Sequence, residues 1–182
     1  QVTFHAIHNL IRPFRDIIKI RWSQHGFIST KKNETPRNLM AFKDGTVNPR
    51  KNNDLKKYVF IDNGWAENGT YCIIRRIQIH IETWDRTALE EQEATFGRKR
   101  STGAPLTGKK EFDNIDLKAK NNKGKYIIDE NAHTRLAREV KTSIKRRAYN
   151  YNDGTNAKTG DLDTGLMFIC FQKSIQQFID IQ

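Results

Sequence analysis

The chain has 182 residues, of which 36% are hydrophobic, and this suits one domain or one domain with part of another. Its 32 lysines and arginines against 21 aspartates and glutamates give a formal net charge of +11, which invites the hypothesis of an anionic partner. No apolar run approaches the ~18 residues that a membrane span needs.

The chain opens without an initiator methionine or a signal peptide, so we expect a fragment or a processed form. Its two cysteines are too few for a disulfide framework, and their spacing is not that of a zinc site. Both Cys72 and Cys170 lie in apolar runs, which predicts buried thiols.

The first part of the chain contains one helix and little other regular pattern. Apolar residues recur every three or four positions across residues 4–18, which predicts a helix that Pro13 ends or kinks. Residues 19–30 should form a short strand and a loop. Further on, Asp44 and Gly45 follow a short apolar run, and both are typical turn residues.

The rest of the chain mixes strands and helices. The predicted elements are, in order, strands starting at residue 58 and over 71–84, a helix over 85–97 opened by a Thr87–Glu90 capping box and closed by Gly97, an irregular segment over 98–125, a short helix within 126–140, strands over 144–154 and 164–172, and a helix from residue 174. This order predicts an α+β domain with an antiparallel sheet and helices on one face. The simplest match is a ferredoxin-like βαββαβ unit without its last strand.

Residues 118–147 hold ten basic and three acidic residues, which is typical of a solvated face or of a frame around an anionic ligand. His133 lies in this basic part, after a predicted turn. Arg146 and Arg147 precede a strand, so alternation should direct their side chains to opposite faces. The five histidines and two cysteines show no metal-ligand spacing, and no phosphate or dinucleotide motif is present.

Three stretches occur in a characteristic order: "NLMAFKDGTVNP", "RRIQIHIETWDRTALEEQEATFGRKRSTGAPL" and "HTRLA…RRAYNYNDG…DTGLMFICFQ". Together they closely resemble the dye-decolourising (DyP-type) haem peroxidases, and most of all the exported subfamily linked to bacterial iron uptake, also described as deferrochelatases. That family pairs two ferredoxin-like halves in the dimeric α+β barrel superfamily. The resemblance implies that residues 1–60 are the end of the N-terminal half plus a connection, and that residues 61–182 are an incomplete, haem-binding C-terminal half.

The resemblance also implies a site for haem b (iron protoporphyrin IX). The family's G-x-x-D-G motif falls on Ala41–Gly45, so Asp44 matches the distal aspartate. Arg146 matches the distal arginine, which is both catalytic and haem-binding, and His133 matches the proximal ligand of the iron. Ala41 replaces the first glycine of the motif, and a positive φ at that position would strain an alanine by about 1 kcal/mol or more.

Four further residues complete the implied haem site. Gly45, Thr46 and Val47 directly follow the aspartate and should line the haem. Arg138, five positions after His133, is the expected partner of a haem propionate, because a guanidinium pairs well with a carboxylate.

The implied function is a haem-dependent peroxidase that reduces hydrogen peroxide and oxidises bulky organic reductants, linked to iron or haem acquisition. Asp44 would move a proton between the peroxide oxygens, and Arg146 would stabilise the charge that develops as the O–O bond breaks. The family further implies export by the twin-arginine route to the cell envelope or outside, membrane partners in iron uptake, and a homo-oligomer for the whole protein.

Two other hypotheses stay open. A haem-binding protein that extracts iron from haem would keep His133 but make little use of Asp44. A nucleic-acid-binding module would rest on the net charge alone, and because the sequence has no recognisable nucleic-acid-binding motif we expect no such partner.

Overall fold

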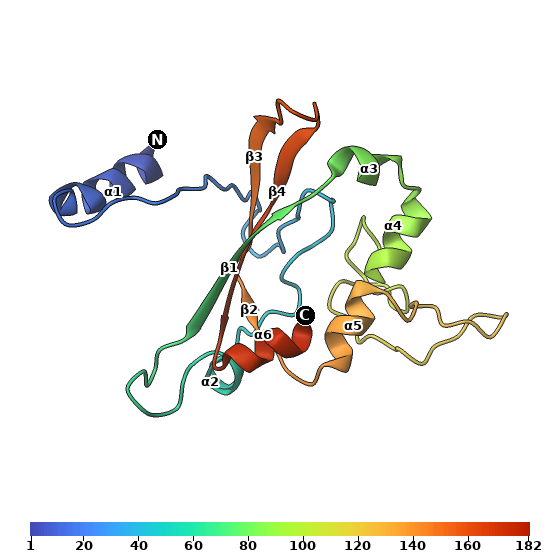
Figure 1. Cartoon of the computed structure of the whole chain (residues 1–182). Helices are drawn as coiled ribbons and strands as arrows, with labels where there is room; N and C mark the ends of the chain where they lie inside the picture. The colour runs from blue at the N-terminus through green and yellow to red at the C-terminus, as the bar shows by residue number, and fades with distance from the viewer.

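The computed structural model describes all 182 residues and has an antiparallel sheet with helices packed beside it (Figure 1). The elements in chain order are α1 (Val2–Ile11), the 3₁₀ turn η1 (Arg12–Phe14), α2 (Asn52–Tyr58), β1 (Tyr71–Gln78), α3 (Ile81–Arg86), α4 (Leu89–Phe96), α5 (His133–Glu139), β2 (Lys145–Arg146), β3 (Tyr149–Thr155), β4 (Leu162–Gln172) and α6 (Ile175–Ile181). The predicted α+β class with an antiparallel sheet is confirmed.

Strand β4 is the centre of the sheet. It pairs with β1 along one edge, in a register that runs from Tyr71 opposite Gln172 to Gln78 opposite Gly165. Its other edge pairs with β2 and then with β3, so these two short strands act as one interrupted strand. This is the order of the first three strands of a ferredoxin-like unit, and no strand pairs with the outer edge of β1, where a fourth strand of that unit would lie.

Two strands predicted in the first part of the chain are wrong. Residues 19–30 contain only an isolated bridge between Phe27 and Asn150. The strand predicted to start at residue 58 does not form: Tyr58 is the last residue of helix α2, and residues 59–64 are turns and irregular chain. Helix α2 has Asp54 in its first turn and lysines in its last. These charges suit the two ends of the helix dipole, and they favour a helix over an extended chain.

The strand predicted over residues 71–84 ends at Gln78, and residues 81–86 form helix α3 instead. Helix α4 begins after Ala88 without a capping box, because the Thr87 hydroxyl donates a hydrogen bond to the carbonyl oxygen of Thr83 at 3.2 Å. Gly97 ends α4 as predicted. Apolar alternation therefore continues past the point where the chain turns, and the periodicity alone does not reveal that turn.

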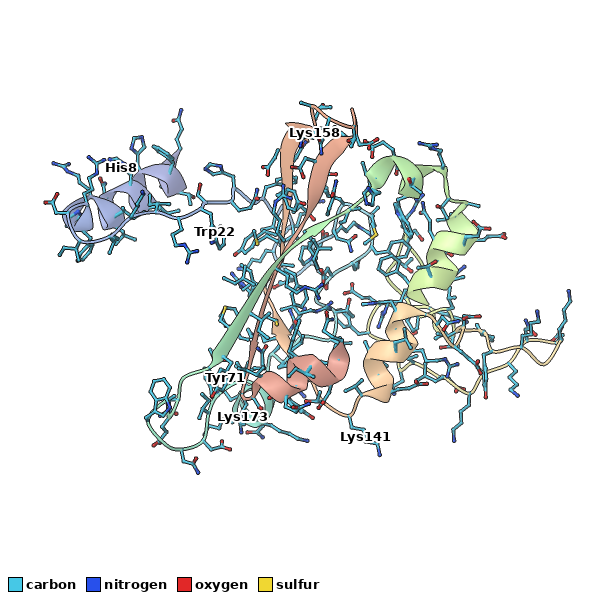
Figure 2. The ribbon with its side chains drawn as sticks, in the orientation of Figure 1. His8, Trp22, Tyr71, Lys141, Lys158 and Lys173 are labelled. Carbon is cyan, nitrogen blue, oxygen red and sulfur yellow. The ribbon has the colours of Figure 1, made fainter.

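Helix α1 lies on an arm that extends away from the sheet, as the positions of His8 and Trp22 show in Figure 2. None of its residues is buried, and the exposed fractions of Phe4 and Leu10 are 61% and 71%. No helix of the structure combines the length and apolar character that crossing a membrane requires. The arm therefore presents an apolar surface without a partner inside this chain.

The two cysteines differ in their surroundings. Cys170, in the central strand β4, is fully buried, as predicted. Cys72 is exposed, so the prediction of a second buried thiol is wrong. It lies on the edge strand β1, and adjacent residues of a strand point to opposite faces, so its apolar neighbours do not shield it.

Candidate functional site

The carboxylate of Asp44 faces the guanidinium of Arg146. Asp44 Oδ1 and Arg146 Nη1 are 3.1 Å apart, and the two side chains are 16% and 23% exposed. Asp44 lies on a tight loop before α2, whereas Arg146 lies on strand β2 at the edge of the sheet. The fold therefore brings together two residues that are far apart in the sequence, and both were predicted for the site.

A small hairpin holds the Asp44 loop. Arg37 and Lys43 form a bridge, and the Asp44 amide donates to the carbonyl oxygen of Pro36 at 2.8 Å. Phe42 at the hairpin end is 2% exposed, and full burial of such a side chain is worth about 1.5–3 kcal/mol. The carboxylate therefore extends from a loop that is anchored directly beside it.

The positions that flank Asp44 adopt the left-handed backbone conformation. Ala41 has a φ of 67°, which an L-residue adopts only with strain, so the substitution of the motif glycine carries the expected cost. Gly45 has a φ of 107°, and a Cβ there would lie 3.1 Å from Asn48 Nδ2. Gly45 therefore permits the sharp turn that follows the carboxylate.

Asn48 fixes the backbone of Arg146, and sequence reasoning missed this role. Its Nδ2 donates to the Arg146 carbonyl oxygen at 2.8 Å, and its Oδ1 accepts from the Arg146 amide at 2.9 Å. The Asn48 side chain thus forms both backbone hydrogen bonds of Arg146 that a neighbouring strand would otherwise form. Only the Asn-Pro pair was visible in the sequence, and it indicated a turn rather than this contact.

His133 is the first residue of helix α5, and its environment includes both residues of the Asp44–Arg146 pair. The residue is accessible to solvent, yet surrounding protein atoms desolvate its ring, and this burial lowers its pKa. The positive charge of Arg146 lowers the pKa further, whereas the negative charge of Asp44 raises it. The net result favours a neutral imidazole, which is the form that binds iron.

A chain of aromatic rings connects the Asp44 loop to the histidine. Phe42 stacks on Phe96 with ring centroids 4.0 Å apart, and Phe96 lies edge-on to His133 at 5.8 Å. Because Phe96 ends helix α4, this contact sets how far α5 lies from the Asp44 loop. Packing of these rings thereby links the Asp44 loop to His133, whereas Arg146 is held beside Asp44 by their ion pair and by Asn48.

A cavity of about 390 Å³ opens beside Asp44 and Arg146, and Gly45 and Asn48 also line it. His133 does not line this cavity. The rest of the cavity wall is strongly basic, with four further cations: Arg37, Arg50, Lys145 and Arg147. Both members of the Arg146–Arg147 pair thus contribute to one cavity, although strand alternation predicted opposite faces.

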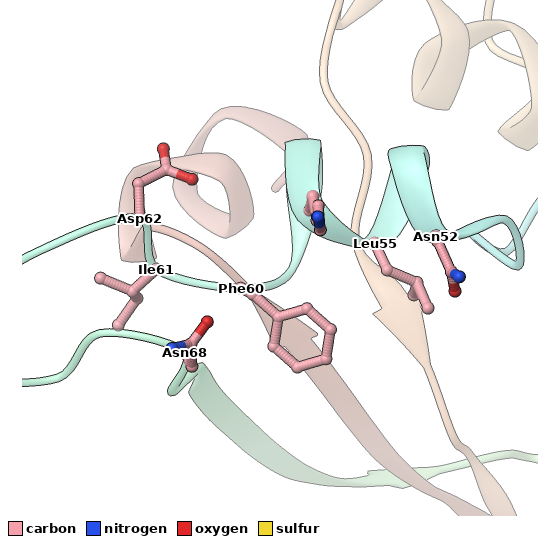
Figure 3. A pocket seen from close by; sticks show the side chains of 7 residues that line it. Asn52, Leu55, Phe60, Ile61, Asp62 and Asn68 are labelled. Atoms are coloured by element: carbon pink, nitrogen blue, oxygen red, sulfur yellow. The ribbon is translucent and has the colours of Figure 1, made fainter.

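Another cavity, of about 330 Å³, lies between α2 and the loop that follows it (Figure 3). Its walls include Leu55, Phe60 and Asp62, and none of the predicted site residues contributes to it. It lacks an ion pair like that of Asp44 and Arg146, so the Asp44 region is the candidate site.

Three other residues were predicted to contact the haem, namely Thr46, Val47 and Arg138. The Thr46 hydroxyl donates a hydrogen bond to Glu111 Oε1 at 3.0 Å, and Val47 is 55% exposed. Arg138 is exposed on α5 and forms no ion pair. The haem-lining role of these residues stays a prediction.

The donor set fits a haem group. This chain has no cluster of three or more histidine, cysteine or acidic side chains that could hold a metal ion. A single neutral imidazole, His133, matches the proximal position of a haem iron, and the Asp44–Arg146 pair matches the polar distal side.

The strand order and this donor set define a ferredoxin-like α+β protein with a site of the haem-protein type. The chain belongs to the Dyp-type peroxidase family: residues 35–182 match the family description "Dyp-type peroxidase, C-terminal", and residues 1–28 match "Dyp-type peroxidase, N-terminal". The boundary between the two matched segments lies between residues 28 and 35, whereas the expected boundary between the two halves was at residue 60. The Asp44 loop therefore lies in the C-terminal match.

Curated relatives and solved structures agree with this assignment. The chain is 38% identical over 200 residues to a deferrochelatase of Yersinia pseudotuberculosis and 39% identical over 196 residues to one of Escherichia coli K12. All of this chain is covered in the first comparison and 98% in the second, with 45% and 46% of the relatives. The DtpA protein of Streptomyces lividans, solved as an oxyferrous complex, superimposes with a TM-score of 0.92 at 33% identity, over 98% of this chain and 52% of DtpA. The chain thus spans about half the length of its relatives.

Proposed function

We propose that this chain supplies the haem-binding part of a peroxidase that reduces hydrogen peroxide and oxidises an organic reductant. The observation that carries the proposal is the 3.1 Å contact between Asp44 Oδ1 and Arg146 Nη1, with His133 in electrostatic reach of both. A structural ion pair has no need of a partly open cavity or of a neighbouring neutral imidazole. Family membership supports the proposal.

The proposed chemistry divides among three side chains. When bound, haem would supply the iron that takes up peroxide, with the His133 imidazole as its ligand. Asp44 would take a proton from one peroxide oxygen and return it to the other, so that the second oxygen leaves as water. Arg146 would stabilise the negative charge on the departing oxygen, because its guanidinium is already fixed beside the reaction space.

The proposal is tested by rapid mixing of the haem-loaded whole protein with hydrogen peroxide, followed by a bulky organic reductant. Peroxide-dependent oxidation that saturates in peroxide is expected, together with its loss in an Asp44→Asn, Arg146→Leu double variant. Equal turnover by wild type, this double variant and free haem would contradict it.

A second function, removal of iron from haem, has one specific observation in its favour, namely the name deferrochelatase of the relatives that match 98–100% of this chain. It predicts release of iron with an intact, fluorescent porphyrin when no peroxide is added. Peroxide-driven turnover with bleaching of the haem would favour the peroxidase instead. Export by the twin-arginine route and membrane partners in iron uptake belong to the same proposal.

A further inference from the structure

Glu111 contacts the chain on both sides of Asp44. Its Oε2 lies 2.5 Å from Lys43 Nζ, and its Oε1 accepts a hydrogen bond from the Thr46 hydroxyl at 3.0 Å. Lys43 directly precedes Asp44, and Thr46 follows it by two positions. One carboxylate therefore brackets the loop that carries the proposed proton shuttle.

Glu111 is itself held in place. Arg98 donates from Nη1 to the carbonyl oxygens of Gly103 at 2.6 Å and of Glu111 at 3.0 Å, which joins two parts of the irregular segment. Gly103 has a φ of 76°, and a Cβ there would lie 2.7 Å from Lys43 Cδ and 3.4 Å from Glu111 Cγ. The absence of a side chain at Gly103 leaves the space that the Lys43–Glu111 pair occupies.

The pair is shielded from water. The side chains of Glu111 and Lys43 are 10% and 19% exposed. Burial raises the pKa of Glu111, but hydrogen bonds from Lys43 and from threonine hydroxyls lower it by more, so the carboxylate stays ionised. Removal of one partner from such a pair leaves a buried charge without compensation, which is strongly unfavourable.

The pair also controls which cation meets Asp44. The side chain of Lys43 is adjacent in sequence to the carboxylate, yet its ammonium group is bound to Glu111, and the ion pair of Asp44 is with Arg146. We propose that Glu111 is a positioning residue, which holds the loop so that Asp44 faces Arg146 and keeps Lys43 away from that carboxylate. This inference goes beyond the proposed peroxidase function, and only its kinetic test rests on that function.

The first test follows hydrogen exchange of the backbone amides of residues 41–48 in the whole protein. Glu111→Gln should increase exchange in this loop at least about tenfold, because a local opening loses its restraint. Glu93→Gln is the matched control, since Glu93 is also 10% exposed and paired with a lysine, Lys99 at 2.8 Å, but does not contact the loop. Unchanged loop exchange in Glu111→Gln, or an equal increase in the control, would overturn the proposal.

The second test separates the two half-reactions of the haem-loaded protein. Glu111→Gln should reduce kcat/KM for peroxide roughly 10–100-fold, the effect of a small misplacement of a reacting group, and leave kcat/KM for the reductant unchanged. Pairing it with Lys43→Gln should restore part of the loss, because no unpaired buried charge then remains. A loss shared equally by both substrates, or no rescue, would contradict a positioning role.

The role of Glu111 can still be tested if the Glu111→Gln variant does not fold or if the wild type does not react with peroxide. Should Glu111→Gln fail to fold, Thr46→Val removes just one hydrogen bond to the same carboxylate and must show the same changes at smaller size, or the proposal is wrong. Should the wild type not react with peroxide, the peroxidase function fails, and loop exchange still decides the role of Glu111.

Discussion

The guanidinium of Arg138 lies close enough to that of Arg98 to affect its pKa. Burial lowers the pKa of Arg98, and the positive charge of Arg138 lowers it further, with a smaller opposing effect from Glu111. Neither arginine has an ion pair with a carboxylate. An anion bound beside two such like charges would reduce their repulsion.

This relationship leads to a prediction for Arg138→Gln. If Arg138 pairs with a haem propionate, the variant should bind haem about tenfold more weakly, because a hydrogen bond to a charged group is typically worth about 1.5–3 kcal/mol and solvent exposure reduces this. The measurement is a haem titration followed by absorbance. Haem dimethyl ester, which lacks free carboxylates, should bind wild type and variant equally. A tenfold difference that persists with the ester would exclude the propionate contact, and Arg21→Gln controls for net charge.

The second prediction separates the two members of the distal pair. Asp44→Asn should slow the reaction with peroxide by ~10²–10⁴-fold and abolish the acidic limb of its pH profile, because the amide cannot take up a proton. Arg146→Leu should slow it by roughly 10²–10³-fold and keep that limb. Stopped-flow mixing with peroxide between pH 3 and pH 8 distinguishes the two variants. A wild-type rate and limb in Asp44→Asn would assign the chemistry to Arg146 instead.

The third prediction concerns His133. His133→Ala should lose most haem during gel filtration, since the only expected iron ligand is removed. His80→Ala, at an exposed histidine directly before helix α3, should retain haem like the wild type. An unchanged haem spectrum in His133→Ala would remove this residue from the site.

The lowered pKa of His133 gives this binding a defined pH dependence. Only the neutral imidazole binds iron, and an unperturbed histidine becomes protonated below about pH 6.5. Because burial and Arg146 lower the pKa of His133, haem binding should persist below pH 6.5 and decline only as the pH falls through the lowered value. Arg146→Leu removes one of the lowering effects, so its decline should begin at a higher pH. Identical pH profiles would contradict the electrostatic coupling.

The fourth prediction uses the strained backbone at Ala41. Ala41→Gly should increase the free energy of unfolding by up to about 1 kcal/mol, because glycine adopts a positive φ without a Cβ clash. Ala94→Gly, within helix α4, should decrease it by about 1 kcal/mol. Chemical denaturation of both variants measures the two values. A destabilised Ala41→Gly protein would mean that the loop relieves its strain in some other way.

Sequence patterns predicted the parts of the fold that repeat. Alternation predicted β1 and helical spacing predicted α1, because an apolar face imposes a period even where, as in α1, that face is exposed in this chain. The strand expected at residue 58 and helix α3, which was not predicted, show the limit, since a short apolar run fits a strand, a turn or a helix. At the site, the resemblance supplied Asp44, His133 and Arg146; the structure pairs Asp44 with Arg146, and His133 lies outside the cavity that these two line.

The supporting residues could not be predicted in the same way. Asn48 bonds the backbone of Arg146 across 98 positions of sequence, and Glu111 reaches Lys43 across 68. Neither residue lies in a repeating pattern, and an asparagine before proline or a glutamate in a charged loop has many ordinary explanations. Such contacts arise from tertiary packing alone.

The position of β4 in the middle of the sheet has a consequence for biosynthesis. Strand β1 is made well before its partner β4, and β2 and β3 also pair with β4, although Asn150 of β3 bridges Phe27 as well. During translation none of these pairings with β4 can form until the ribosome has released the stretch from Leu162 to Gln172. Strand β2, which carries Arg146, therefore gains its strand partner late relative to β1, and until then the unpaired apolar strands are open to aggregation.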